Sequence, residues 1–115
     1  MTDEYRFLRY DMSGGIASIE LDRPPVNAIH EAMTDEYFDA LARADQDDAV
    51  KVLILSGRGK GLSAGADLRY LEAFGTQEMA EFLEKFYVQQ VERVRGLKKP
   101  IVASVHGFAR EGACT

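Results

Sequence analysis

The chain has 115 residues, enough for one small domain, and its 46% hydrophobic and 29% charged residues predict a packed globular fold. Its net charge of −5 argues against nucleic acid or an acidic membrane surface as the main partner. No signal peptide is visible, and no apolar stretch approaches the roughly 20 residues that span a bilayer. The single cysteine, Cys114, excludes an internal disulfide and fits a reducing compartment, so we expect a cytoplasmic protein.

The first half of the sequence predicts a β-hairpin, a loop and a helix. Residues 5–12 alternate in part, residues 13–15 have turn chemistry, and residues 16–22 continue the strand pattern. Residues 23–28 must form a loop, because their two prolines remove amide donors. In residues 31–46 apolar side chains recur at helical spacing among acidic ones, which predicts an amphipathic surface helix.

The second half predicts two buried strands joined by a loop and helices. Residues 50–57 are almost continuously apolar, which is typical of a strand covered on both faces. A glycine-rich loop follows, and residues 68–74 begin a short helix. Thr76 is the expected cap of a second long helix that Pro100 stops, and residues 101–105 form another strand of the buried type. The strand–helix–strand order implies a parallel crossover and therefore an α/β fold.

The segment GLSAG, residues 61–65, matches the G-x-S-x-G pattern of a hydrolase nucleophile. That interpretation needs Ser63 on the turn between strand and helix, but RGKGL intervenes, and His106 is the only later histidine. We therefore expect Ser63 to be a small loop residue and keep a serine hydrolase as the less favoured alternative. His30 is expected to be a capping or surface group. Neither histidine has a partner at metal-ligand spacing, so no metal site is predicted.

The backbone of the SAGAD segment, residues 63–67, is more informative than its serine. Small residues let a ligand approach the main chain, and Asp67 stands where a helix N-cap would. The amides at a helix start are unpaired and can point at a polarised oxygen. A second small-residue turn, REGACT, follows the next strand, so amides from both loops could form an oxyanion hole. The alternative is that both segments are only tight turns.

Three blocks of the sequence resemble the enoyl-CoA hydratase/isomerase (crotonase) family: IELDRPPVNAI, DDAVKVLILSGRGKGLSAGADLRYL and KKPIVASVHGFAREGAC. They occur in the family's order and spacing and span nearly the whole chain. The resemblance implies a crotonase-like spiral of ββα units that is truncated here, with residues 1–115 as the N-terminal part of a single acyl-CoA-binding domain. It also implies a homotrimer or hexamer when full-length, a place in fatty acid metabolism, and no cofactor apart from the coenzyme A thioester that serves as substrate.

The resemblance also assigns site residues. In the family, two backbone N–H groups hold the thioester oxygen and stabilise an enolate, and the matching positions are Ala66 and Gly112. Asn27 and Ala28 are expected to contact the coenzyme through main-chain groups. Arg69 is expected either near a coenzyme phosphate or as a solvated surface arginine. The full set of implied substrate-binding residues is Val26, Asn27, Ala28, Ala64, Ala66, Asp67, Leu68, Arg69 and Gly112.

The glycine-rich turn departs from the hydratase pattern. Hydratases usually read G-G-G-C-E here, and that glutamate is one of two acid/base carboxylates, whereas this chain has Thr115 in its place. A threonine hydroxyl cannot act as a general base at neutral pH. Glu111 stands one place before Gly112, is expected to project differently, and receives no role. The sequence thus predicts a hydratase-like or isomerase-like enzyme, with a catalytically inactive acyl-CoA-binding module as the alternative.

Overall fold

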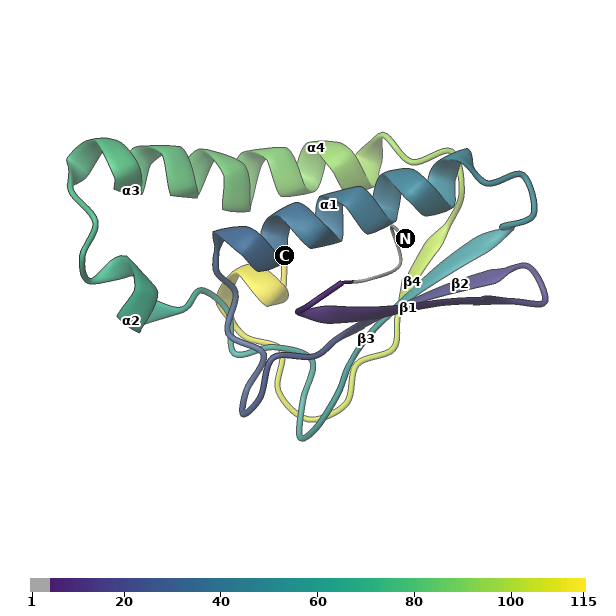
Figure 1. Cartoon of the computed structure of the whole chain (residues 1–115), viewed down its shortest axis with the longest axis horizontal. Coiled ribbons are helices and arrows are strands. Elements are labelled where there is room, and N and C mark those ends of the chain that lie inside the picture. Colours follow the sequence, from purple (N-terminus) through teal and green to yellow (C-terminus); the bar gives the residue numbers. More distant parts are fainter. Residues whose placement is uncertain (1–4) are drawn as a thin grey trace.

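The computed structural model describes residues 5–115, which form a four-stranded sheet with helices on one side of it (Figure 1). The strands are β1 (Leu8–Ser13), β2 (Ile16–Leu21), β3 (Val52–Gly57) and β4 (Ile101–Ala103), in the spatial order β1-β2-β3-β4. The β1–β2 pair is antiparallel, whereas β2–β3 and β3–β4 are parallel. The predicted hairpin and the parallel crossover are therefore confirmed.

The helices form two layers above the sheet. Helix α1 (Glu31–Gln46) has the predicted bounds and contacts β1, β2 and α4. The second long helix is a rod of three consecutive parts: α3 (Thr76–Leu83), the π-helical segment η1 (Glu84–Gln89) and α4 (Gln90–Arg95), which lies over α1 in Figure 1. Its cap is Gly75 rather than the expected Thr76, and the Gly75 N–H donates to the Glu78 carboxylate at 2.9 Å.

The hydrophobic core lies between the sheet and α1. Ile19 of β2 and Leu53 of β3 are fully buried, and Met33 and Leu41 of α1 pack in the same cluster. These residues occupy the apolar positions whose spacing predicted strands at β2 and β3 and an amphipathic helix at α1. The core therefore fixes where β2 and β3 end, and so where the loops that follow them begin.

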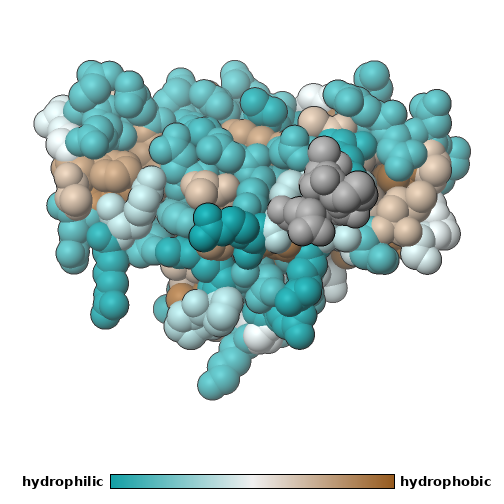
Figure 2. Space-filling model, in the orientation of Figure 1, coloured by the Kyte–Doolittle hydropathy of each residue, from teal (hydrophilic) through white to brown (hydrophobic). Residues whose placement is uncertain are grey.

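The two parallel strands are less covered than their composition predicts. β4 has only three residues, and Val102 and Val105 are each 53% exposed. Along β3, Leu53 and Gly57 are buried and the other four residues are half-buried, because the helices among residues 5–115 lie on one side of the sheet. The face shown in Figure 2 is mainly hydrophilic, with hydrophobic side chains in small separate places. Within residues 5–115, no helix is both long and apolar enough to cross a membrane.

Candidate functional site

The loops that follow β3 and β4 run side by side. Ser63 and Ala109 form a parallel bridge between them. Leu62 N–H donates to the Phe108 carbonyl at 2.8 Å, and Arg110 N–H donates to the Ser63 carbonyl at 3.1 Å. Because parallel strands end at the same edge of a sheet, the two small-residue loops meet there, as expected.

A glycine makes this close approach possible. Gly107 has a φ of +62°, and a Cβ atom at this position would lie 1.8 Å from the Lys60 carbonyl oxygen. No other residue type fits, because the backbone conformation and the space both exclude a side chain. Gly107 thus allows the backbones of the two loops to pack against each other.

Asn27 clamps the loop after β2 to the loop after β3. Its side chain is almost fully buried, and its Nδ2 donates to the carbonyls of Arg58 and Leu62, each at 3.0 Å. Its Oδ1 accepts from the Arg23 N–H at 2.8 Å. Its own N–H donates to the Arg23 carbonyl, and its carbonyl accepts from the Ser63 hydroxyl. The expected main-chain contact from Asn27 to the coenzyme therefore has no free N–H.

Ser63 is part of the same clamp. Its side chain is fully buried, and its hydroxyl donates to the Asn27 carbonyl at 2.6 Å and accepts from the Gly65 N–H at 3.0 Å. His106 does not approach it, because the His106 ring nitrogen lies 2.6 Å from the Gly59 carbonyl. A buried hydroxyl with both roles filled and no histidine base cannot be a nucleophile. This geometry supports the prediction that Ser63 is a small loop residue.

Asp67 caps the short helix α2 (Leu68–Leu71). Its Oδ1 accepts from the N–H groups of Arg69 and Tyr70, at 3.1 and 3.3 Å, and its Oδ2 accepts from Arg23 at 2.7 Å. Partial burial raises the pKa of Asp67, but the bonds from Arg23 and the helix amides outweigh burial and leave the pKa below its ordinary value. Asp67 is thus an ionised structural residue that orients the chain directly after Ala66.

Two predicted coenzyme-binding segments, residues 26–28 and 64–69, lie side by side and form what we call the rim of the site. The Ala64 N–H donates to the Val26 carbonyl at 2.9 Å, which joins the two predicted coenzyme segments. Leu68 is 70% exposed, and Arg69 is exposed beside it. The Ala28 carbonyl accepts from Arg23 at 2.7 Å, so this carbonyl already has a partner.

The two predicted oxyanion amides differ in their surroundings. The Ala66 N–H donates to the Glu111 carboxylate at 2.9 Å. Gly112 lies in the 3₁₀ helix η2 (Glu111–Ala113), and its N–H has no hydrogen-bond partner among residues 5–115. Glu111 itself adopts a φ of +54°. Glu111, to which the sequence analysis gave no role, therefore has its side chain hydrogen-bonded to one of the two candidate amides.

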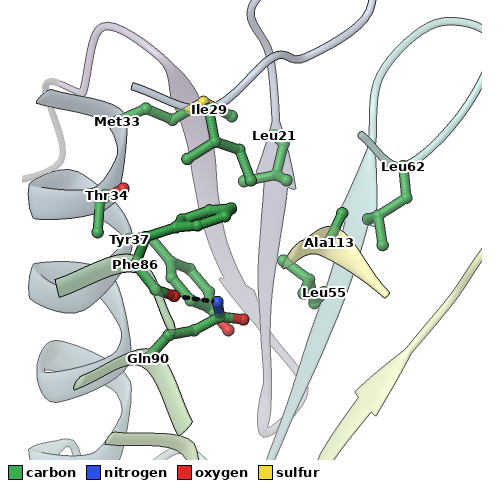
Figure 3. Close-up of a pocket in the computed structure, with 10 residues that line it drawn as sticks. All are labelled: Leu21, Ile29, Met33, Thr34, Tyr37, Leu55, Leu62, Phe86, Gln90 and Ala113. Carbon is green, nitrogen blue, oxygen red and sulfur yellow. Dashed lines mark hydrogen bonds between the residues drawn. The ribbon is translucent and has the colours of Figure 1, made fainter. Parts of the chain in front are cut away.

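An apolar pocket of about 50 Å³ lies beside η2 (Figure 3). Tyr37 and Phe86 reach into it from the helices, and Ala113 faces them from η2. Burial raises the pKa of Tyr37 to about 12, so its hydroxyl stays neutral. Phe86 also packs on the site turn, since a Cβ atom at Gly112 would lie 2.2 Å from the Phe86 ring.

Three residues that shape the site were not predicted from the sequence. Arg23 donates to Asp67, and Phe86 packs against the η2 turn. Glu111 reaches the Ala66 amide through a positive φ that its residue type does not reveal. Each depends on a contact between distant segments, which local patterns do not encode.

Comparison with known proteins places this geometry among relatives. A sequence model of the enoyl-CoA hydratase/isomerase family matches residues 11–115. The chain is 34% identical over 113 residues to a probable enoyl-CoA hydratase of Rhizobium meliloti (strain 1021), covering 96% of this chain and 42% of that protein. It is 29% identical over 113 residues to the 1,2-epoxyphenylacetyl-CoA isomerase of Escherichia coli (strain K12), covering 95% of this chain and 43% of that protein.

Solved structures of the same family are similar to this chain as well. The crystal structure of an enoyl-CoA hydratase/isomerase from Xanthobacter autotrophicus Py2 is similar with a TM-score of 0.88 and 32% identity, covering 96% of this chain and 42% of that one. The chain spans 33% to 43% of the length of the curated relatives it matches.

Proposed function

Because this chain belongs to the enoyl-CoA hydratase/isomerase family, we propose that it processes acyl-CoA thioesters, with the thioester oxygen bound to the N–H groups of Ala66 and Gly112. These amides stabilise the negative charge that the oxygen gains as an enolate forms. The α/β fold is the crotonase-like fold, which the chain covers in part. In this proposal residues 1–115 are the N-terminal part of a single acyl-CoA-binding domain.

One observation carries the proposal: the Ala66 amide already holds an anionic oxygen. Its N–H donates to the Glu111 carboxylate at 2.9 Å, so it is oriented to receive a negatively charged oxygen without rearrangement of the loop. An enolate oxygen has similar charge and hydrogen-bonding needs. In other enzymes, losing one such donor costs roughly 3–4 kcal/mol of transition-state stabilisation.

The coenzyme portion of the substrate follows the rim of the site. Val26, Ala64 and Leu68 supply contact surface there, and Arg69 gives a cation for a coenzyme A phosphate on an otherwise acidic protein. The acyl group enters the pocket of Figure 3, whose lining is mainly hydrophobic and which begins next to Gly112. No cofactor besides the substrate takes part.

Family membership also supports a wider context for the full-length protein. We propose a homotrimer or hexamer that acts in fatty acid metabolism, without nucleic acid or membrane partners. The single cysteine and the acidic net charge support a cytoplasmic setting.

Turnover of crotonyl-CoA and 3-butenoyl-CoA by the full-length protein tests the proposal. Hydration of the first thioester indicates a hydratase, and a shifted double bond in the second indicates an isomerase. Ala66→Pro removes an N–H whose partner among residues 5–115 is the Glu111 side chain. We expect this variant to lose at least about 100-fold in turnover. Ala66→Gly, which keeps the N–H, is the matched control and is expected to retain turnover.

Each other outcome has a distinct meaning. An Ala66→Pro protein that is folded by circular dichroism and still turns over would overturn the oxyanion assignment. Tight binding of both thioesters without reaction would favour the inactive acyl-CoA-binding module, for which Thr115 at the usual glutamate position is the supporting feature. Absence of binding to either thioester would exclude both interpretations.

A further inference from the structure

We infer that Glu111 is a catalytic carboxylate of this site. Its Oε1 accepts the Ala66 N–H and, once a thioester oxygen replaces it there, the carboxylate removes a proton from C2, the carbon beside the thioester carbonyl. The inference rests on the proposed function of the Ala66 and Gly112 amides, and it supplies the carboxylate that Thr115 does not.

The backbone aims Glu111 at the amide. Its φ of +54° is a conformation that residues other than glycine rarely adopt, and it costs free energy. A Cβ atom built on Gly65 would lie 2.9 Å from the Glu111 Cβ and 2.8 Å from its Oε1, so the side chain crosses directly over Gly65. Strained residues of this kind cluster at functional sites, because the surrounding structure must hold them in place.

The carboxylate of Asp67, in the same loop as Ala66, already has its partners. Both Asp67 oxygens already accept hydrogen bonds, one from Arg23 and the other from the α2 amides. Glu111 is exposed, and its Oε1 accepts the N–H of the same amide that a ligand would claim. Burial raises the pKa of Tyr87, and the charge of Glu111 adds to that rise. Of these two carboxylates, Glu111 is the one that is free to leave its partner when a thioester binds.

Bond lengths place the proton within reach. One N–H cannot hold two oxygens at full strength, so the thioester oxygen displaces Oε1 from the Ala66 amide. C2 of a thioester lies only about 2.4 Å from the carbonyl oxygen, as C–C and C=O bond lengths require. Rotation about the side-chain torsions of Glu111 then brings the displaced carboxylate to the C2 hydrogen.

The step balances without another reactant. The carboxylate takes the C2 proton, the C–H electron pair forms a double bond to the carbonyl carbon, and the carbonyl π pair moves onto the oxygen. The resulting enolate oxygen is bound by the N–H groups of Ala66 and Gly112. Protonated Glu111 then returns a proton to C2, or to C4 of a 3-enoyl chain, which shifts the double bond.

Deuterium exchange into butyryl-CoA tests this step directly. Butyryl-CoA has no double bond, so deuterium that appears at C2 in D₂O reports proton removal alone. The full-length protein is incubated with butyryl-CoA, and the incorporated deuterium is measured by mass spectrometry. We expect wild type to exchange and Glu111→Gln to exchange at least about 100-fold more slowly, as loss of a general base requires. Gln keeps the size and the acceptor oxygen of Glu. Glu84→Gln, which removes an exposed carboxylate in η1, is the matched control and is expected to exchange like wild type.

Binding separates a catalytic role from a structural one. A neutral Gln oxygen competes less well for the Ala66 N–H, so Glu111→Gln should bind butyryl-CoA about threefold to tenfold more tightly. A merely structural Glu111 would instead weaken binding when replaced. If circular dichroism shows that the Gln variant is unfolded, Glu111→Asp takes its place, with slower exchange and retained binding expected.

The outcomes distinguish the two proposals. Exchange at the wild-type rate in a folded Glu111 variant overturns the role of Glu111 and leaves the proposed function standing. Binding of butyryl-CoA by wild type without any exchange also overturns the role of Glu111 and leaves the proposed function standing. No binding of butyryl-CoA by wild type overturns the proposed function, and the role of Glu111 falls with it.

Discussion

Replacing Asn27 by Ala tests whether one buried amide holds the loops of the site together. The Asn27 side chain is 2% exposed and makes hydrogen bonds to Arg23, Arg58 and Leu62 at 2.8, 3.0 and 3.0 Å. Each lost bond costs about 1 kcal/mol of stability. The backbone φ of +54° adds about 1 kcal/mol, because Ala tolerates the left-handed region less well than Asn. We expect a total loss of about 4 kcal/mol.

Denaturant unfolding of the full-length protein measures this loss, and a drop in Tm on the order of 10 °C should accompany it. Asn27→Gly is the informative comparison, since glycine accepts the positive φ but loses the same bonds. It should be about 1 kcal/mol less destabilising than Ala. Asn27→Asp turns a donor into an acceptor against the Arg58 and Leu62 carbonyls and should be at least as harmful as Ala. If Asn27→Ala lowers the free energy of unfolding by less than about 1 kcal/mol, the Asn27 side chain does not hold the loops together.

Three further predictions concern pH and backbone space. Burial lowers the pKa of His30 below 6.5, so its stabilising contribution is present above pH 6.5 and is lost as pH falls through the folded-state pKa. Unfolding measured against pH should show this loss in wild type but not in His30→Phe. The pKa of Asp67 is lowered from 3.8, so its contribution is present above pH 3.8 and is lost as pH falls through its folded-state pKa. Asp67→Asn should be less stable at neutral pH and lack that acid step, and unchanged neutral stability would contradict the capping role. Gly107→Ala places a Cβ 1.8 Å from the Lys60 carbonyl and should cost at least about 3 kcal/mol of unfolding free energy, whereas Gly59→Ala, with a positive φ but open space, should cost about 1 kcal/mol. Equal losses in the two variants would show that the close approach is not what requires glycine.

Local chemistry was sufficient to predict most elements of the fold. The acidic and apolar spacing of α1 defined its bounds, and the turn residues after β1 defined the hairpin. Tertiary partners decided the rest. Val102 was predicted in a buried strand but is exposed, because cover depends on what packs against the sheet. Lys99 follows the second long helix in the sequence, yet its Nζ donates to the carbonyls of Ala44 and Asp47 at the end of α1.

The candidate site was predictable where it depends on backbone and not where it depends on one side chain. The small residues around Ala66 and Gly112 indicated two loops with available amides, and the structure brings those loops side by side. The contact from Glu111 to Ala66 required a positive φ at a non-glycine residue and the distance between the loops. Neither quantity is encoded in the spacing of residue types.

Binding of the thioester oxygen by the Ala66 and Gly112 amides can be observed directly. Selective ¹⁵N labelling of alanine and glycine in the full-length protein allows both amide resonances to be followed by NMR. We predict that butyryl-CoA shifts both resonances, whereas S-butyl-CoA, a thioether without the carbonyl oxygen, binds and leaves them in place. Equal shifts with the two ligands, or no shift while butyryl-CoA is bound, would contradict the account.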